Sequence, residues 1–198
     1  TPRILEALRT YDGASTFFMV GTNVERYPDV VRQVAESGSE IASHTYDHPN
    51  LTQLSGDRLK YQLIRVSELI NELTGQQVSV KTLRPPYGAV SEQVREAADT
   101  PLILWSMDTL DWKTRDAQKT ISHVLEQVED GDIILMHDIH AESADAAVAI
   151  IPQLTAMGYQ LVTVQELMQA KELEMLPGQK IFSGNPASHG SSVMLTDQ

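Results

Sequence analysis

Short apolar runs alternate along this chain with longer segments in which apolar residues recur every three or four positions. The short runs are typical of buried strands, and the longer segments are typical of helices that bury one face. The clearest helix is predicted between Ser55 and Gly75. Its apolar stripe consists of Leu59, Leu63, Val66, Ile70 and Leu73.

The same patterns predict an α/β fold. Strands are predicted at 16–20, 40–43, 80–83, 102–105, 132–136 and 161–163. Helices are predicted at 1–10, 23–38, 55–75, 91–98, 117–129, 144–157 and 164–174. This alternation predicts a parallel sheet, and strands this short and regularly spaced favour a (β/α) barrel over an open doubly wound sheet. No glycine-rich phosphate loop follows any strand, which weighs against a nucleotide-binding fold.

Residues 1–176 are therefore predicted to form one domain. The segment 177–198 is rich in proline, glycine, asparagine and serine, so we expect a loop-like extension without a core of its own. His189 lies in this extension and is expected to be an ordinary solvated histidine.

Composition excludes several classes of site and partner. The net charge of -12 makes nucleic acid an unfavourable partner, since an acidic surface repels phosphates. The absence of cysteine excludes thiolate metal sites, cysteine nucleophiles and disulfides. No apolar run approaches the ~20 residues of a membrane-spanning helix. No signal peptide is visible, and because the chain starts at Thr1 we expect a mature, cleaved or excerpted product.

His44 and His48 are the first candidate site residues. Two imidazoles four residues apart can converge on one point, and imidazole is the commonest protein ligand for zinc. The alternative is a pair of surface histidines. Thr45 stands where a helical zinc protease carries its glutamate base, so that class of enzyme is excluded.

Other residues capable of chemistry follow the predicted strands. They are His44 and His48 after 40–43, Arg84 and Tyr87 after 80–83, Asp108, Asp111 and Trp112 after 102–105, and His137, Asp138 and His140 after 132–136. The carboxyl ends of the strands form the face of a (β/α) barrel on which active sites lie. We therefore expect these side chains to share one active site.

Several of these residues have a structural alternative. Arg84 could form a salt bridge at the end of the barrel or hold a catalytic carboxylate. The turn at Tyr87 could be only a rigid loop, or its backbone N–H could face a developing oxyanion. Asp111 could cap a helix or pair with a histidine that acts as general acid. Trp112 could belong to the core or form the wall of a sugar site, and Leu135 could belong to the core or line an acyl pocket.

Asp47, Asp138 and His140 are individually weak candidates. Together the residues predict a metal-assisted hydrolase of an amide or ester, in which His137 protonates the leaving group. Two parts of such a site are missing. A catalytic zinc usually has three protein ligands, whereas only His44 and His48 are evident, and no general base is evident.

Four stretches of the chain resemble successive motifs of the NodB-type polysaccharide deacetylases, carbohydrate esterase family 4. These stretches are His44-Thr45-Tyr46-Asp47-His48, Arg84-Pro85-Pro86-Tyr87-Gly88, Asp108-Thr109-Leu110-Asp111-Trp112 and Leu135-Met136-His137-Asp138. The resemblance spans roughly residues 1–174 and is greatest to the peptidoglycan N-acetylglucosamine deacetylases of Gram-positive bacteria. It implies a distorted (β/α) barrel of the NodB type.

The resemblance also implies a role for each residue. His44 and His48 would bind one divalent metal, usually zinc and in some members cobalt or nickel. Arg84 would hold the catalytic base, and Asp111 would pair with the general acid His137. The Tyr87 backbone amide would complete the oxyanion hole. Trp112 and Leu135 would line the pocket for the acetyl group.

One family motif is absent. Thr-Phe-Asp-Asp-Gly lies on the family's first strand, carries the base and the third metal ligand, and would immediately precede Thr1. We expect a separate N-terminal segment of the same protein to supply these two aspartates beside the strand predicted at 16–20. The barrel of this chain would then lack its first strand, and activity would require that segment.

The resemblance implies removal of acetyl groups from N-acetylglucosamine in a polysaccharide, most simply peptidoglycan. Deacetylation of chitin oligomers or acetyl-xylan is an alternative substrate assignment. A glycan-binding module without catalysis is an alternative of a different class, because the motif that carries the base is absent. The family resemblance also implies an extracellular or cell-surface location, associated with the cell wall.

Overall fold

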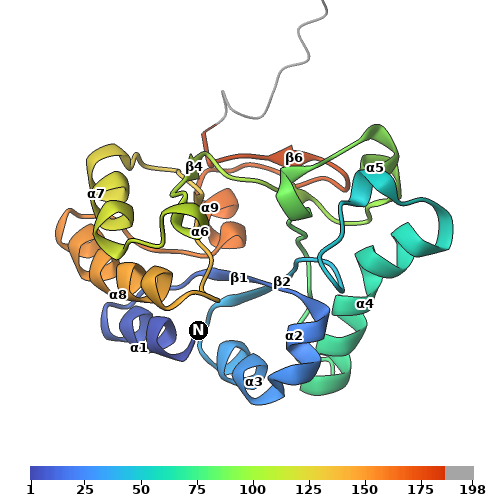
Figure 1. Ribbon diagram of the computed structural model, residues 1–198, viewed down its shortest axis with the longest axis horizontal. Helices are drawn as coiled ribbons and strands as arrows, with labels where there is room; N and C mark the ends of the chain where they lie inside the picture. The colour runs from blue at the N-terminus through green and yellow to red at the C-terminus, as the bar shows by residue number, and fades with distance from the viewer. Residues whose placement is uncertain (186–198) are drawn as a thin grey trace, which may run out of the picture.

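The computed structural model describes residues 1–185 of the chain. Short strands occupy the middle of the molecule and helices surround them (Figure 1). The helices are α1 Pro2–Thr10, α2 Gly21–Arg26, α3 Pro28–Glu36, α4 Gly56–Thr74, α5 Glu92–Ala97, α6 Asp111–Thr114, α7 Ala117–Gln127, α8 Ala141–Ala156 and α9 Val164–Ala170. The strands are β1 Thr16–Met19, β2 Glu40–Ser43, β3 Leu102–Ile103, β4 Met107–Asp108, β5 Ile134–Leu135 and β6 Lys180–Ile181. This order confirms the predicted α/β class.

All of the paired strands run parallel. β1 pairs with β2, β3 pairs with β6, and β4 pairs with β5. Leu83 forms bridges to both Ser43 and Leu102, and thereby links β2 to β3. Within residues 1–185, β1 has β2 as its only strand partner, and α1 begins at Pro2 without Thr1 entering the sheet.

The longest helix, α4, begins and ends where its sequence predicts. Ser55 is its N-cap, and Gly75 ends it in the left-handed conformation with φ of 61°. Four residues of its predicted stripe are buried, and Leu73 packs against them at the edge of the core. Burial of each large aliphatic side chain contributes about 1.5–3 kcal/mol, so this stripe fixes α4 against β2.

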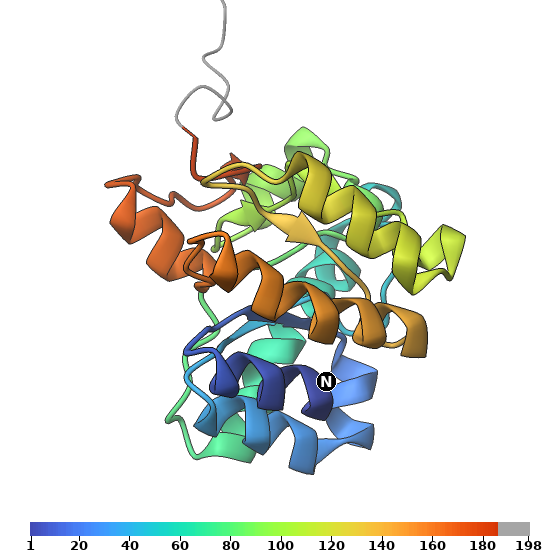
Figure 2. The ribbon, with the colours of Figure 1, turned by 90° about the vertical axis from the view of Figure 1, so that its left-hand side faces the viewer.

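On the opposite side of the strands, α8 packs against both α1 and α7 (Figure 2). Ala144 and Ala147 of α8 meet Ile4 and Leu8 of α1. Such small residues allow the two helices to approach closely. These contacts hold the N-terminal part of α8 against α1. The loop after β5 leads directly into this part of α8.

The helix predicted at 23–38 is divided. α2 starts at Gly21, with Val20 rather than Asn23 as its N-cap, and α3 starts at Pro28. Proline lacks a backbone N–H and disfavours helical backbone in the preceding residue, here Tyr27 at φ −129° and ψ 55°. Proline at the first position of α3 is favourable for the same reason.

Several strands are shorter than predicted. The stretch 80–83 contributes only the isolated bridges of Leu83, and Pro85 and Pro86 follow it directly. The stretch 161–163 has no strand pairing, although the Leu161 carbonyl accepts a hydrogen bond from the Ala14 N–H at 2.9 Å. A short apolar run therefore predicted where the chain passes through the core, but it did not predict how many of its residues form strand pairings.

The prediction that the chain after residue 176 is loop-like is wrong at β6. Lys180 and Ile181 pair with β3, and the Leu104 N–H donates to the Ile181 carbonyl at 2.7 Å. Ile181 is fully buried beside Ile103 and Met168. The turn residues around β6 masked a two-residue strand that completes this part of the core. His189 lies outside the described residues.

No helix in the described part of the chain is both long and apolar enough to cross a membrane.

Candidate active site

His44 and His48 lie in a tight turn that follows β2. Thr45 and His48 both adopt left-handed backbone, with φ of 66° and 61°, which folds the chain back on itself. The two imidazole rings meet edge to face with centroids 4.7 Å apart. Strain of this kind at non-glycine residues is typical of functional sites. The turn thus brings together the two imidazoles that the sequence predicted to converge.

Both imidazoles are in the state that binds a metal. The His44 Nδ1 lies 2.6 Å from the Arg84 carbonyl oxygen, so Nδ1 carries the proton and Nε2 keeps its lone pair. Burial lowers the pKa of His44 to about 4. Burial also lowers the pKa of His48. Both rings are therefore neutral at pH 7 and able to donate a nitrogen lone pair.

The described residues provide only part of a metal site. Two neutral imidazoles suit a divalent ion such as zinc. However, residues 1–185 contain no group of three His, Cys, Asp or Glu side chains placed to hold one. Asp47, the nearest acidic residue in sequence, instead accepts a hydrogen bond from Gln62 Nε2 at 2.8 Å. The donor set fits a metal that takes a further ligand from elsewhere.

Asp111 and His137 form the second half of the site. The His137 Nδ1 lies 2.8 Å from Asp111 Oδ1, and the His137 backbone N–H donates to Oδ2 at 2.7 Å. Asp111 is buried, whereas the His137 side chain is 32% exposed. Asp111 also begins α6, and its Oδ1 accepts the Trp112 N–H. Asp111 therefore pairs with the histidine but does not cap the helix, because Leu110 is the N-cap of α6 and no side-chain capping hydrogen bond is present.

The charge on Asp111 is secured by these hydrogen bonds. Burial alone would raise the pKa of the carboxyl group. The hydrogen bonds from the His137 imidazole and backbone outweigh burial, and they hold the pKa of Asp111 well below its usual range. A carboxylate on Nδ1 fixes the imidazole orientation and directs its Nε2 outward from the pair, the arrangement required of a general acid.

Arg84 is a buried cation without an anion. Its guanidinium donates to the carbonyl oxygens of Ile103 and Leu104 at 3.3 and 3.1 Å, and it lies 4.0 Å from the centroid of the Phe18 ring. No carboxylate oxygen of residues 1–185 lies within ion-pairing distance, so the salt bridge considered from the sequence is absent there. Burial lowers the pKa of Arg84 to about 9. A cation in this position favours an incoming carboxylate.

The Arg84-Pro85-Pro86-Tyr87-Gly88 turn is rigid and strained. Tyr87 has φ of 61°, and its ring is 69% exposed and meets His48 with centroids 4.9 Å apart. Gly88 also has positive φ, and a Cβ there would come 3.0 Å from the Trp105 ring. The turn places the Tyr87 ring beside His48, and the oxyanion role of the Tyr87 backbone N–H stays a prediction.

Trp112 and Leu135 have different environments. Trp112 is 49% exposed, so it is not a core residue, and it is free to form the wall of a site. Leu135 is buried, and its carbonyl accepts a hydrogen bond from Thr109 Oγ1. Trp112 directly follows Asp111 in α6, shortly after β4. Leu135 lies in β5, two residues before His137, and β5 pairs with β4.

Three weaker candidates are engaged elsewhere. Asp108 accepts the Leu110 N–H at 2.9 Å. Asp138 accepts a hydrogen bond from the Thr1 hydroxyl. His140 Nδ1 accepts a hydrogen bond from Arg115 Nη1 at 2.7 Å. Sequence reasoning missed Arg115, and the signal available was its position three residues after Trp112.

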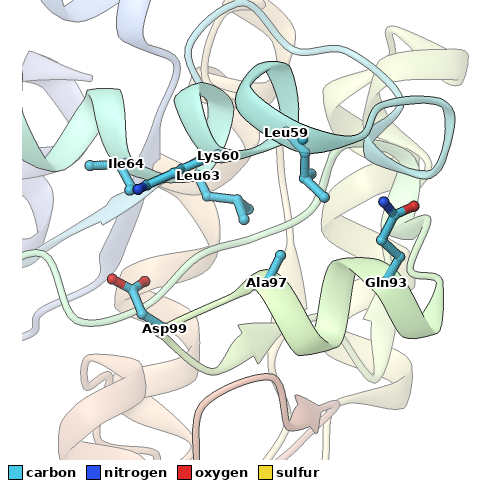
Figure 3. A pocket seen from close by; sticks show the side chains of 8 residues that line it. Leu59, Lys60, Leu63, Ile64, Gln93, Ala97 and Asp99 are labelled. Atoms are coloured by element: carbon cyan, nitrogen blue, oxygen red, sulfur yellow. The ribbon is translucent and has the colours of Figure 1, made fainter.

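The histidines form one cluster. Burial is the largest cause of the lowered pKa of His44, and the charges of His48, Arg84 and His137 lower it further, although the hydrogen bond to the Arg84 carbonyl raises it. The residues that follow β2, Leu83, β4 and β5 therefore converge, as the sequence predicted. A hollow of about 440 Å³ lies elsewhere, between α4 and α5 (Figure 3). None of the residues that line it belongs to the histidine cluster.

Comparisons with known proteins agree with this geometry. The family described as Polysaccharide deacetylase matches residues 1–101. The peptidoglycan-N-acetylmuramic acid deacetylase PdaC of Bacillus subtilis is 38% identical over 172 residues, which cover 87% of this chain and 36% of that protein. The peptidoglycan-N-acetylglucosamine deacetylase PgdA of Listeria monocytogenes is 39% identical over 171 residues, which cover 86% of this chain and 36% of that protein.

A solved structure gives the same result for the fold. The structure described as T48 deacetylase with substrate superposes with a TM-score of 0.85 at 37% identity, covering 91% of this chain and 88% of that one. This similarity confirms the predicted distorted (β/α) barrel of the NodB type. The chain belongs to the polysaccharide deacetylase family.

Proposed function

We propose that this chain forms most of a metal-dependent hydrolase that removes acetyl groups from N-acetylglucosamine residues of peptidoglycan. The observation that carries the proposal is the pairing of buried Asp111 with half-exposed His137 next to two neutral imidazoles, His44 and His48. This combination suits amide hydrolysis, which needs a Lewis acid for the carbonyl and a proton donor for the leaving amine.

The choice of peptidoglycan rests on similarity to relatives. The PdaC and PgdA proteins carry the name of that substrate, and this chain corresponds to 36% of the length of each. Exposed Trp112 provides a flat apolar surface suited to a sugar ring. Chitin oligomers and acetyl-xylan remain the alternative substrates. Action on peptidoglycan would place the protein outside the cell or at its surface, associated with the cell wall.

His44 and His48 would hold the divalent ion, zinc or alternatively cobalt or nickel. When bound, that ion would supply Lewis-acid polarisation of the acetyl carbonyl and activation of water. The chain's own residues do the rest. Asp111 fixes Nδ1 of His137, which leaves Nε2 to deliver a proton to the departing amine. The Tyr87 backbone N–H would stabilise the oxyanion, and Trp112 and Leu135 would enclose the acetyl group.

We further propose that a segment N-terminal to Thr1 completes the site with two adjacent aspartates. Three observations on residues 1–185 support it: β1 has one strand partner, Arg84 has no carboxylate partner, and the metal-binding group has fewer than three ligands. One aspartate would complete the protein ligands of the metal. The other would lie within hydrogen-bond reach of Arg84 and act as the general base.

Fusion of the missing motif tests this function. In the Asp-Asp fusion, a segment containing Thr-Phe-Asp-Asp-Gly precedes Thr1, and in the matched Asn-Asn fusion both aspartates are asparagine. With zinc present, the Asp-Asp fusion should release acetate from peptidoglycan and the Asn-Asn fusion should not. Binding of the glycan by both fusions without acetate release by either would favour the glycan-binding module. The absence of both binding and acetate release would contradict the proposed function.

A further inference from the structure

Arg115 lies immediately after α6, the single turn that carries Asp111 and Trp112. We propose that its guanidinium binds a carboxylate on the glycan beside the acetylated sugar, such as the lactyl carboxylate of a muramic acid residue. This inference rests on the proposed function, because it assigns a substrate-recognition role next to the same site.

Two hydrogen bonds hold the guanidinium in place. Its Nε donates to the Trp112 carbonyl oxygen at 2.9 Å, and its Nη1 lies 2.7 Å from His140 Nδ1. Arginine cannot accept a hydrogen bond, so Arg115 donates and His140 Nδ1 accepts. Of the five N–H donors of a guanidinium, these bonds use two. The side chain is thus pre-organised, and its remaining donors are available to a planar anion.

The backbone supports the same arrangement. Leu110 and Arg115 flank α6, and both have left-handed backbone with φ of 54° and 48°. Left-handed backbone at residues other than glycine costs of order 1–3 kcal/mol and persists where the surroundings enforce it. The strain on both sides of α6 keeps Trp112 and Arg115 in a fixed relation to each other.

The guanidinium lies close to the reacting groups. His140, its hydrogen-bond partner, donates its backbone N–H to the His137 carbonyl at 3.3 Å. The charges of Asp111 and His137 both act on His140, as does the charge of Arg115. An anion bound by Arg115 would therefore sit near the general-acid pair and next to the exposed face of Trp112.

Although the net charge of -12 repels anions overall, the surroundings of Arg115 differ from those of several other arginines. The sequence has 27 acidic and 15 basic residues, and Arg9, Arg32, Arg65 and Arg95 each pair with a carboxylate of their own helix. Arg115 is exposed, yet no carboxylate oxygen in the described part of the chain lies within 4.0 Å of it.

The charge of the glycan decides which substrates this site would favour. The muramic acid residues of peptidoglycan carry a lactyl carboxylate or its peptide extension, whereas chitin carries no carboxylate. Arginine binds carboxylates through paired N–H donors. Arg115 would then favour a peptidoglycan fragment with a free muramic acid carboxylate over a chitin fragment of equal length, and an amide-linked peptide on that carboxyl group would remove the preference.

Binding by the chain itself tests the proposal without catalysis. Three tetrasaccharides are titrated and followed by NMR chemical shifts: a muramic acid fragment with a free carboxylate, the same fragment with that carboxylate converted to an amide, and a chitin fragment. The wild-type chain should bind the free acid about fivefold more tightly than the amide, the gain expected from one charged hydrogen-bonded contact at an accessible site. Arg115→Gln should remove that difference and leave chitin binding unchanged.

Lys113→Gln is the matched control, because Lys113 is another exposed cation of α6 that lacks the two hydrogen bonds of Arg115. It should bind all three glycans like the wild type. Equal affinity of the wild type for acid and amide would overturn the proposal, whatever the variants do. An equal loss of acid and chitin binding in Arg115→Gln would show a merely structural role. If none of the glycans bound, the proposed function would fail together with the subsite.

Discussion

The two halves of the site differ in how completely the chain supplies their parts. In the half formed by β4 and β5, buried Asp111 makes three hydrogen bonds to His137 and Trp112, so the half that would supply the proton is complete. In the half formed by β1, β2 and Leu83, two neutral imidazoles and the Arg84 guanidinium have no carboxylate partner within residues 1–185. This difference supports the proposal that an aspartate-bearing segment completes the second half.

The largest effect on acetate release is expected from removing the proposed general acid, His137, from the complete half of the site. In the Asp-Asp fusion, His137→Ala should reduce acetate release by about 10²–10⁴-fold, the usual contribution of a positioned general acid. Zinc affinity should remain unchanged, because His137 is not a proposed ligand. Acetate release is measured by enzymatic assay and zinc by calorimetry.

His123→Ala is the control for this variant, since His123 is a partly exposed residue of α7 whose side chain lies within hydrogen-bond distance of Gln127. It should retain full activity. Loss of zinc binding in His137→Ala would mean that the two halves are not separate, and the comparison above would break.

The next effect concerns His44, in the incomplete half of the site, which should make the free energy of unfolding depend on pH. The pKa of His44 is about 4 in the folded chain against 6.5 as its ordinary value, because burial disfavours the charged ring. The unfolded chain therefore binds a proton more readily between these two values. Stability from this group is fully present above pH 6.5 and is lost as the pH falls toward 4, by about 3 kcal/mol in total.

Urea unfolding from pH 7.5 to 4 measures this slope. His44→Gln keeps a neutral donor for the Arg84 carbonyl and cannot titrate, so its stability should fall less over the same range. The two slopes should be compared without added metal, because bound metal would stabilise the wild type selectively. Parallel curves for wild type and variant would contradict the buried, neutral state of His44.

A smaller effect is expected from Arg84→Met. Its effect on the free energy of unfolding should reverse sign when the Asp-Asp fusion supplies a carboxylate. A buried cation without an anion destabilises the fold, so Arg84→Met in the chain alone should raise the free energy of unfolding by about 1 kcal/mol. In the Asp-Asp fusion the same substitution should lower it, because a buried aspartate would lose its partner. Arg95→Met, at an exposed site, is the control and should change stability by less than about 0.5 kcal/mol in both proteins. Equal shifts in the chain and the fusion would show that no carboxylate approaches Arg84.

The residue pattern predicted the parts of this molecule that depend on burial and on strand order. The apolar stripe and caps of α4 were evident, and so was the convergence of His44, His48, Arg84, Asp111 and His137 at the ends of successive strands. These predictions succeed because a parallel sheet brings the carboxyl ends of its strands to one edge. The pairing of Asp111 with His137 was implied by the family resemblance.

Other features depend on tertiary contacts that have no local signal. The two-residue strand β6 is held by its pairing with β3 and by burial of Ile181, although glycine and proline surround it. The division of α2 from α3 at Tyr27 and Pro28 could have been predicted, since proline gives a specific local signal. The hydrogen bonds of Arg115 could not, because they follow from the left-handed backbone that ends α6.

Metal binding tests the central claim most directly. Zinc content and affinity should be measured for the Asp-Asp fusion, the Asn-Asn fusion and a His44→Ala/His48→Ala variant of the Asp-Asp fusion. We expect one zinc per molecule in the Asp-Asp fusion, weaker binding by at least about tenfold in the Asn-Asn fusion, and loss of the metal in the double histidine variant. Full zinc occupancy in the double histidine variant would contradict the assignment of His44 and His48 as the metal site.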